Sequence, residues 1–477
     1  MSVDEWKLHD QFDLEGLWWL PQESDRRIRG KLKFDRSQPI TLRLEGELGR
    51  PDLRGDVRPF TPRVILGETT EGKAVTLVDA WEYQRADTIS AGISTFLGET
   101  VYLGAHFDSL TNIRFRRLYI ECTELHGWLG VNVPLNYDDA PGNKAFHIRF
   151  SDLGLKETFV CQVHVPRIRV AFVNKTAFSQ ASPWICHMAT DPCISITPQE
   201  PKGLEWYLRV SSRISQLLTH LLWKPVSLVR VWGRLPLSAE EKGTGLQTDP
   251  VFIYFRHSYV GKESNVPEHV FRFPQVRPIF EKLLNGWLSN AEMLGIAYDL
   301  CAHSFYEEDA VLEVNFLLVC HALESLHRMI KRGKYVHSSE YEEIKRVMTD
   351  AIPSGTIDPL RQKLSAVLRW ANEYSFRRRI DALIKMVDPE CYELIVVDGD
   401  RFRDQITDTR NRLTHNDPSF SGRYLEREDL LRLYVRARAM LVLLLLKEAG
   451  LPLQLAAEAI KNTWHLKGQL QNARLHA

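Results

Sequence analysis

Two residues that could act together on a phosphodiester lie five positions apart in the segment FRDQITDTRNRLTHNDP, residues 402–418. Arg410 is a permanent cation, and His415 can accept or release a proton near neutral pH. An imidazole moves protons for attack by a ribose 2′-hydroxyl, and a guanidinium stabilises charge on the phosphoryl oxygens; together they suffice for RNA cleavage without a metal. Because this attack needs the 2′-hydroxyl, the pair predicts action on RNA and not on DNA.

Residue spacing places this pair on a helix. The 4, 3, 4 spacing predicts a buried stripe of Phe402, Ile406, Thr409 and Leu413. At about 100° per residue, a polar stripe follows the opposite face and consists of Asp404, Asp408, Asn411 and His415, with Arg410 on the flank. Pro418 ends the helix just past His415, so the imidazole lies on the last turn, where the helix dipole favours its protonated form. We expect Asp408 and Asn411 to orient the ring.

The pattern of Arg, four residues and His is short, and it leaves an alternative open. It also occurs at Arg332 to His337, where Gly333 follows the Arg and a helix is expected to end. For Arg410 and His415, the alternative is a capped helix end with a solvated charged face. If the face is catalytic, one helix does not enclose it, and a two-fold dimer that closes a cleft between two copies is the simplest solution.

The elements that must position this helix are themselves helical. Two apolar stripes at helical spacing run through Leu312, Phe316, Val319, Leu323, Leu326 and Ile330, and through Leu430, Leu433, Ala437, Met440 and Leu444. Helices are predicted over 276–303, 308–332, 338–351, 358–372, 375–387, 401–415 and 425–448. The C-terminal 200 residues therefore read as an all-α bundle.

The N-terminal half has the pattern of strands. Apolar and polar residues alternate over 40–45, 118–123 and 159–165, which is typical of an antiparallel sheet or sandwich with one solvated face. One helix is predicted near 204–223, and Pro225 ends it. We expect an α+β multidomain protein with a β-rich N-terminal domain at 1–261, a linker at 262–278 and a helical domain at 279–477.

Composition excludes several classes of protein. The 477 residues include 61 Lys+Arg and 61 Asp+Glu, and 44% are apolar, so the chain is neither collagen-like nor broadly disordered. Seven Cys in this length fit free thiols in a reducing compartment. The first residues, MSVDEWKLHDQFDL, do not resemble a signal peptide, and the run Ala439 to Leu446 is too short to span a membrane, so we expect a cytoplasmic protein with no membrane partner.

One Cys/His cluster has the residue types of a zinc site. It comprises Cys161, His164, Cys186, His187 and Cys193. Cys161 and His164 differ by three positions on a predicted strand, so their side chains point to opposite faces. Buried structural cysteines are the favoured interpretation, with no metal and no cofactor, and zinc stays open as the alternative.

Basic residues near the motif are candidates for phosphate contacts. Between Asp358 and Lys447 there are 17 Lys+Arg and 14 Asp+Glu. The candidates for RNA binding are Arg377, Arg378, Arg379 and Arg412, and a second cluster comprises Arg432, Arg436 and Arg438. The alternative is that they occupy solvated helix faces.

These residues resemble a known family. RNRLTH within a helical bundle is similar to the R-x4-6-H motif of HEPN ribonucleases, including the polar Asn411 after the Arg. VNFLLVCHALESLHR and TDTRNRLTHND resemble the HEPN domain of ApeA-type anti-phage defence proteins. The N-terminal half is similar to their N-terminal domain in GKLKFDRSQPITLRLEGEL, VILGETTEGKAVTLVDAW and HFDSLTNIRFRRLYIECTELHGWLG.

The resemblance implies an abortive-infection effector that cleaves cellular RNA, tRNA among the candidates, once a phage-derived trigger is sensed. It implies a homodimer through the HEPN domain, with no metal and a 2′,3′-cyclic phosphate product. By matching position, Arg410 and His415 are catalytic and Asn411 supports them. Glu324 matches a Glu of the family's ALE helix, and His321 and Arg328 share its face; alternatively Glu324 is a polar flank of the buried stripe.

Two other functions remain open from the sequence. One is a non-catalytic HEPN scaffold or nucleotide-binding module in which the β domain recognises the ligand. The other is a β-sandwich ligand-binding protein with a helical dimerisation domain. The trigger and the RNA that is cut are not specified by any residue pattern.

Overall fold

The computed structural model describes residues 6–49, 60–87, 92–130, 136–140, 143–147, 154–182, 185–237, 248–256, 268–306, 311–331, 333–415, 425 and 427–474. The chain forms two compact units, and each is described by itself. The first contains residues 1–218, 226–267 and 273–288, and the second contains residues 219–225, 268–272 and 289–477.

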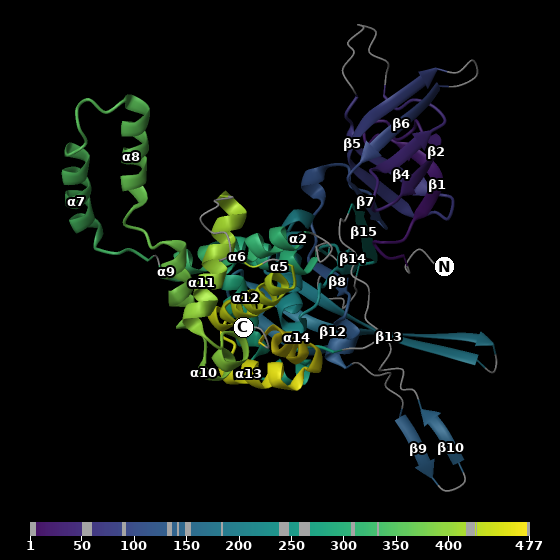
Figure 1. Cartoon of the computed structure of the whole chain (residues 1–477). Coiled ribbons are helices and arrows are strands. Elements are labelled where there is room, and N and C mark those ends of the chain that lie inside the picture. Colours follow the sequence, from purple (N-terminus) through teal and green to yellow (C-terminus); the bar gives the residue numbers. More distant parts are fainter. Residues whose placement is uncertain are drawn as a thin grey trace. The chain divides into compact units, whose positions relative to one another are not determined.

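Six strands of the first unit close into an antiparallel barrel (Figure 1). They are β1 (Phe12–Trp19), β2 (Ile28–Phe34), β3 (Ile40–Leu44), β4 (Arg63–Thr69), β5 (Ala74–Asp87) and β6 (Gly92–Gly98). The order is β5-β4-β1-β2-β3-β6, and pairing of β6 with the second half of β5 closes the ring. Inward residues such as Trp18, Leu32 and Phe96 are fully buried. A Cβ at position 67 would lie 2.4 Å from the Trp18 ring, so the close packing of this ring requires glycine there.

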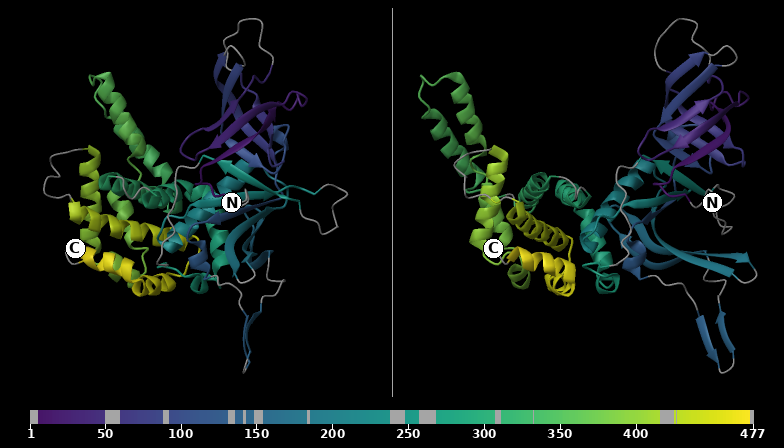
Figure 2. Two further views of the ribbon diagram at one scale, coloured as in Figure 1. Left: turned by 90° about the vertical axis from the view of Figure 1, so that its right-hand side faces the viewer. Right: turned by 45° about the vertical axis from the view of Figure 1, so that its right-hand side comes forward.

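Further strands continue the same sheet from the first half of β5. They are β7 (Thr100–Leu103), β15 (Pro250–Phe255), β14 (Leu228–Arg234), β8 (Arg117–Cys122), β13 (Ile185–Pro198), β12 (Ile168–Ser182) and β11 (Gly154–Val163). The long β12–β13 ribbon is seen from the side in Figure 1 and again in the right-hand view of Figure 2. A separate hairpin pairs β9 (Asn136–Ala140) with β10 (Asn143–His147), and α1 (Leu125–Leu129) follows β8.

Strand β8 differs from the alternation read in its sequence. Its polar face was expected to be solvated, but Tyr119 and Glu121 are buried. Because β8 is hydrogen-bonded to β13 on one side and β14 on the other, it is an interior strand. Tyr119 stacks on Trp232 with ring centroids 5.2 Å apart, and Glu121 pairs with Arg230 at 3.0 Å.

The remaining elements are helices. They are α2 (Leu204–Leu222), α3 (Phe273–Val276), α4 (Phe280–Ser289), α5 (Ala291–Tyr306), α6 (Leu312–Lys331), α7 (Ser338–Asp350), α8 (Asp358–Trp370), α9 (Phe376–Ile384), α10 (Pro389–Ile395), α11 (Gly399–His415), α12 (Arg427–Glu448), α13 (Leu453–Asn462) and α14 (Trp464–Arg474). The β-rich half followed by a helical half confirms the predicted fold class. The core of the second unit includes Phe316, Val319, Leu323 and Leu326 of α6.

The single helix expected over 276–303 is divided at Asn290. The Asn290 carbonyl accepts the Leu294 amide as α5 begins, and its side-chain amide donates to the Glu448 carbonyl at 3.0 Å. Within the first unit, α4 binds the edge of β11, since Glu281 Oε1 accepts the Gln162 amide at 2.9 Å. The segment 273–288 therefore belongs with the β-rich unit, whereas the sequence placed the start of the helical domain at 279.

The cysteines are buried thiols in the described part of the chain. Cys161 and Cys193 are buried on β11 and β13, His164 is exposed, and the side chains of Cys186 and His187 lie outside the described residues. Burial raises the pKa of the Cys161 thiol to about 12, which disfavours the thiolate that a metal needs. None of the described helices has the length and apolar character needed to cross a bilayer.

Candidate active site

Helix α11 carries the Arg410–His415 motif. Asp398 precedes it and accepts the Arg401 amide at 3.0 Å, which satisfies a free N–H of the first turn. Phe402, Ile406 and Thr409 are buried as the periodicity predicts, whereas Leu413 is half-buried. The helix packs against α6, α9 and α12, so the motif is held by a helical core.

Arg410 is oriented without a carboxylate. Its Nη1 donates to Asn411 Oδ1 at 3.1 Å, and its guanidinium carbon lies 5.3 Å from the Phe376 ring centroid. Its Nε is buried and has no hydrogen-bond partner. No described carboxylate forms an ion pair with Arg410, so this guanidinium keeps donors and charge for an anionic ligand.

Arg410 lines a cavity of about 510 Å³. The other lining residues are Glu324 and Arg328 of α6, Trp370 of α8, and Glu373, Tyr374, Ser375 and Phe376 at the start of α9. All of them belong to the second unit. The cavity combines aromatic walls with charged groups, which is the composition expected for binding a nucleotide unit by stacking and by phosphate contacts.

Alternating charges fix one wall of this cavity. Arg328 Nη2 lies 3.0 Å from Glu324 Oε1, and its Nη1 lies 3.1 Å from Glu373 Oε2. The same Glu373 oxygen receives Arg379 Nη2 at 3.1 Å. Because these arginines share acidic partners, they position the wall, and Arg410 differs from them in having none.

A buried imidazole lies beneath this wall. His327 is 1% exposed, and its Nδ1 lies 3.1 Å from Arg379 Nη1, so Nδ1 accepts that hydrogen bond. Burial, with the nearby charges of Arg379 and Lys331, lowers the pKa of His327 to about 4. The ring is therefore neutral at physiological pH and acts as a structural acceptor.

The other motif residues lie elsewhere on α11. His415 is exposed at the last residue of the helix and is not among the residues that line the cavity. Five residues of α-helix rotate by about 140°, so one chain directs Arg410 and His415 to different sides. Asn411 lies between them, bonded to Arg410 and one turn from His415. Asp408 is half-buried, and His321 is exposed one turn before Glu324.

The structure distinguishes among the basic candidates next to the motif. Arg377 is about half exposed and pairs with Asp404 at 2.6 Å. Arg378 is exposed and lies over the Tyr374 ring at 4.6 Å. Arg379 is fully buried, which corrects the expectation that it meets RNA: its Nε donates to the Tyr374 carbonyl, and no part of it reaches the surface. Arg412 is half-buried on α11.

Two members of the second basic cluster are also structural. Arg436 is 3% exposed and donates to the Ile395 and Val396 carbonyls. Arg438 is 6% exposed and donates to the Ser304 carbonyl at 3.1 Å. Both had been candidates for phosphate contacts, and burial removes them. Arg432 remains at the surface and pairs with Asp429 at 2.8 Å.

Sequence reasoning missed Trp370, Glu373, Tyr374 and Phe376. They lie at or next to the facing ends of the helices predicted over 358–372 and 375–387, where no motif marks them. Within the described part of the chain, no group of three or more His, Cys, Asp or Glu residues is arranged to hold a metal ion.

Two family models match the chain, one in its N-terminal part and one in its C-terminal part. The family model described as ApeA N-terminal domain 1 matches residues 13–287, which is more than half of the chain. The chain belongs to the ApeA family. The model described as Apea-like HEPN matches residues 317–455, so every residue lining the Arg410 cavity lies in the HEPN region of this ApeA-type protein. Neither the curated proteins nor the solved structures compared with the chain gave a match.

The pairing of an ApeA N-terminal domain with an Apea-like HEPN domain is that of an anti-phage HEPN effector. It confirms the family resemblance seen in the sequence. The HEPN region of this ApeA-type chain begins within α6 and ends in the first turn of α13, and it includes α11 with its motif.

Proposed function

We propose that this ApeA-type protein is an endoribonuclease that uses Arg410 and His415 and needs no metal. The observation that carries the proposal is the state of Arg410: it lines a cavity in the HEPN region, and no described acidic side chain pairs with it. A partly buried guanidinium without a counter-ion is favoured to bind a phosphate.

The reaction follows from the chemistry of the two groups. A ribose 2′-oxygen attacks the adjacent phosphorus, the bond from phosphorus to the 5′-oxygen breaks, and the products are a 2′,3′-cyclic phosphate and a 5′-hydroxyl. An imidazole takes the 2′-hydroxyl proton, or gives a proton to the leaving 5′-oxygen. Arg410 binds the phosphoryl oxygens, on which negative charge grows in the transition state.

Two copies of the chain satisfy the geometry better than one. Since Arg410 and His415 lie about 140° apart around α11, a phosphate held by one Arg410 is best met by His415 of a second copy. A two-fold axis through the HEPN regions then forms two equivalent sites, each with Arg410 of one copy and His415 of the other. Asn411 then orients Arg410, and Glu324 with Arg328 shapes the wall that receives the nucleotide.

We assign sensing to the β-rich domain and cleavage to the helical domain. The RNA is cellular, tRNA being one candidate, and a phage-derived trigger raises the activity above the basal rate of the protein alone. The protein acts in the cytoplasm as a homodimer. Among the surface arginines, Arg377, Arg378 and Arg412 are proposed to contact the RNA backbone, and Asp408 and His321 to support the motif.

Purified protein tests this proposal directly. The wild-type chain should cut RNA in the presence of EDTA and leave 2′,3′-cyclic phosphate ends. His415→Ala should lower the cleavage rate by at least about 100-fold, with no change in the circular dichroism spectrum. His303→Ala removes an exposed histidine of α5 in the same unit and should leave the rate unchanged. Equal cleavage by wild type and His415→Ala would refute the assignment.

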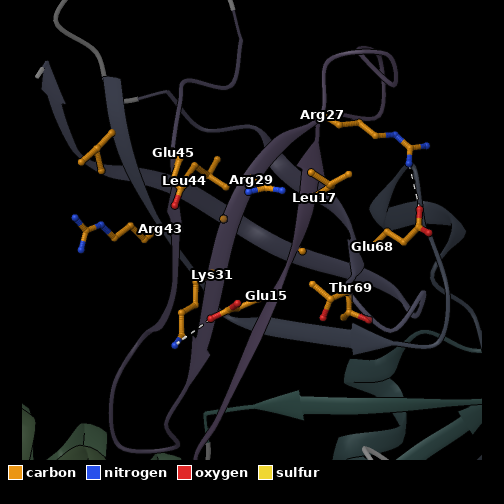
Figure 3. Close-up of a pocket in the computed structure, with 14 residues that line it drawn as sticks. Glu15, Leu17, Arg27, Arg29, Lys31, Arg43, Leu44, Glu45, Glu68 and Thr69 are labelled. Carbon is orange, nitrogen blue, oxygen red and sulfur yellow. Dashed lines mark hydrogen bonds and ion pairs between the residues drawn. The ribbon is translucent and has the colours of Figure 1, made fainter. Parts of the chain in front are cut away.

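A cavity on the barrel favours a second candidate function, ligand recognition by the β domain with a non-catalytic HEPN region. The cavity is about 840 Å³ and lies over β1 to β4 (Figure 3). Arg27 pairs there with Glu68 at 3.1 Å, and Lys31 with Asp13 at 2.8 Å, whereas no described side chain pairs with Arg29 or Arg43. This candidate predicts that defence in cells survives His415→Ala and is lost in Arg29→Glu/Arg43→Glu; the opposite result supports the nuclease.

A further inference from the structure

Helices α7 and α8 form a hairpin that leaves its apolar side chains in solvent. The two helices lie side by side (Figure 1), and neither contains a buried residue. Nine of the 21 exposed large apolar side chains of the described chain fall between residues 335 and 370. An exposed apolar concentration of this kind marks an interaction surface.

The exposed residues follow helical stripes. In α7 the stripe contains Ile344, Val347 and Met348, which are 41%, 56% and 50% exposed. In α8 it contains Leu360, Leu364 and Val367 at spacings of four and three, followed by Trp370 at 61% exposure. Each stripe is what a helix presents to a partner helix, and the hairpin's own packing does not cover it.

We propose that this hairpin is the docking surface for the hairpin of a second copy of this chain. Charge supports this occupant. Helix α7 has four acidic and two basic residues, a net charge of −2, and α8 has one acidic and three basic residues, a net charge of +2. A two-fold axis brings α7 of each copy against α8 of the other, so the same surface is complementary to itself in charge as well as in apolar character.

The base of the hairpin connects this surface to the Arg410 cavity. Its two ends are joined by hydrogen bonds: the Tyr335 amide donates to the Asn372 carbonyl at 2.9 Å, and the Asn372 side chain bonds the Val336 backbone in both directions at 3.0 Å. Directly beside this junction, Trp370, Glu373 and Tyr374 line the cavity. A second copy that docks on the hairpin would therefore contact Trp370, which also lines the cavity.

This inference deepens the proposed function, since it names the surface that would bring a second copy to the HEPN site. It also stands apart from catalysis, because the oligomeric state is measured without RNA.

The mass of the full-length protein in solution tests it. The wild-type chain should be a dimer at micromolar concentration, and Leu364→Glu/Val367→Glu should raise the dimer dissociation constant at least about 100-fold. The matched control, Met293→Glu/Ile296→Glu, changes two exposed apolar residues of α5 and should leave the mass unchanged.

Charge reversal tests the geometry. Lys363→Glu/Arg369→Glu gives α8 the sign of α7, and Glu340→Lys/Glu343→Lys does the reverse, so each variant alone should dissociate. Mixed in equal amounts, the two should form a heterodimer. A monomeric wild type, a dimer that survives Leu364→Glu/Val367→Glu, or a mixture that stays monomeric would overturn the proposal.

RNA cleavage by the same variants separates the two ideas. Loss of both the dimer and cleavage supports the docking surface and the shared site together. Loss of the dimer with full cleavage supports the docking surface and contradicts the two-copy site. A dimer that cleaves no RNA supports the docking surface and refutes the nuclease.

Discussion

The neutral His327 under the cavity wall makes the stability of the helical unit depend on pH. Its Nδ1 accepts a hydrogen bond from Arg379, so a proton on this nitrogen would break the bond and place two cations together. His327→Gln keeps an acceptor oxygen for Arg379 and removes the proton site. We expect the variant and the wild type to have similar free energies of unfolding at pH 7.5 and to diverge in acid.

The sign and size follow from the pKa. The unfolded imidazole takes up a proton near pH 6.5, whereas the folded one does so near 4, because burial and Arg379 oppose the charge. Between these values the unfolded chain binds more protons, so the wild type loses stability as the pH falls below 6.5. At pH 5 the difference reaches at most about 2 kcal/mol, from about 1.4 kcal/mol for each pH unit.

Urea unfolding followed by circular dichroism at pH 7.5, 6 and 5 measures this difference. Other groups titrate equally in both proteins, so subtracting the two curves isolates His327. The wild type should lose about 2 kcal/mol more than His327→Gln between pH 7.5 and 5. Parallel curves would show that His327 is not held neutral and would refute the described hydrogen bond to Arg379.

Further predictions concern the site and the barrel. Arg410→Lys keeps the charge but loses the planar fork, and should lower the cleavage rate about 100-fold, or about 2.7 kcal/mol, while Arg401→Lys at the exposed start of α11 leaves it unchanged. Glu324→Gln removes a negative charge from the cavity and should tighten binding of a non-cleavable 2′-deoxy RNA analogue roughly threefold by fluorescence anisotropy. Gly67→Ala places a Cβ 2.4 Å from a buried tryptophan ring and should cost about 1–3 kcal/mol of stability in thermal unfolding, whereas Gly355→Ala meets no atom within 4 Å and should be neutral.

Local patterns predicted the helices and strands well where one face alone is buried. Tyr207, Ile214 and Leu221 of α2 are buried as their helical spacing predicts. The same reasoning placed Phe402 and Ile406 in the core and left Arg410 and His415 off that face. These helices are amphipathic, so the spacing of their apolar residues predicts which side chains are buried.

Arrangements that depend on distant residues could not be predicted in this way. Closure of the barrel requires β6 to pair with both β3 and β5, and no local signal specifies that register. The Arg410 cavity is lined by residues that lie as far apart in the sequence as Glu324 and Arg410. Glu373 is held in its wall by an ion pair with Arg328, which no sequence motif indicates. Arg379 was wrongly predicted to lie at the surface, because it belongs to a run of three arginines. Its partners Glu373 and His327 allow it to be buried; His327 is distant from it in the sequence, and Glu373 belongs to no recognisable motif.

The measurement that tests the account most directly is complementation between two inactive variants. Arg410→Ala and His415→Ala chains, co-expressed with different tags, form heterodimers in which one of the two sites has both an intact Arg410 and an intact His415, if each site draws on both copies. With half of the dimers mixed and one working site in each, cleavage in EDTA should return to about one quarter of the wild-type rate. Purified heterodimers as inactive as either parent would contradict a site shared between copies, and full activity of either parent alone would contradict the roles assigned to these two residues.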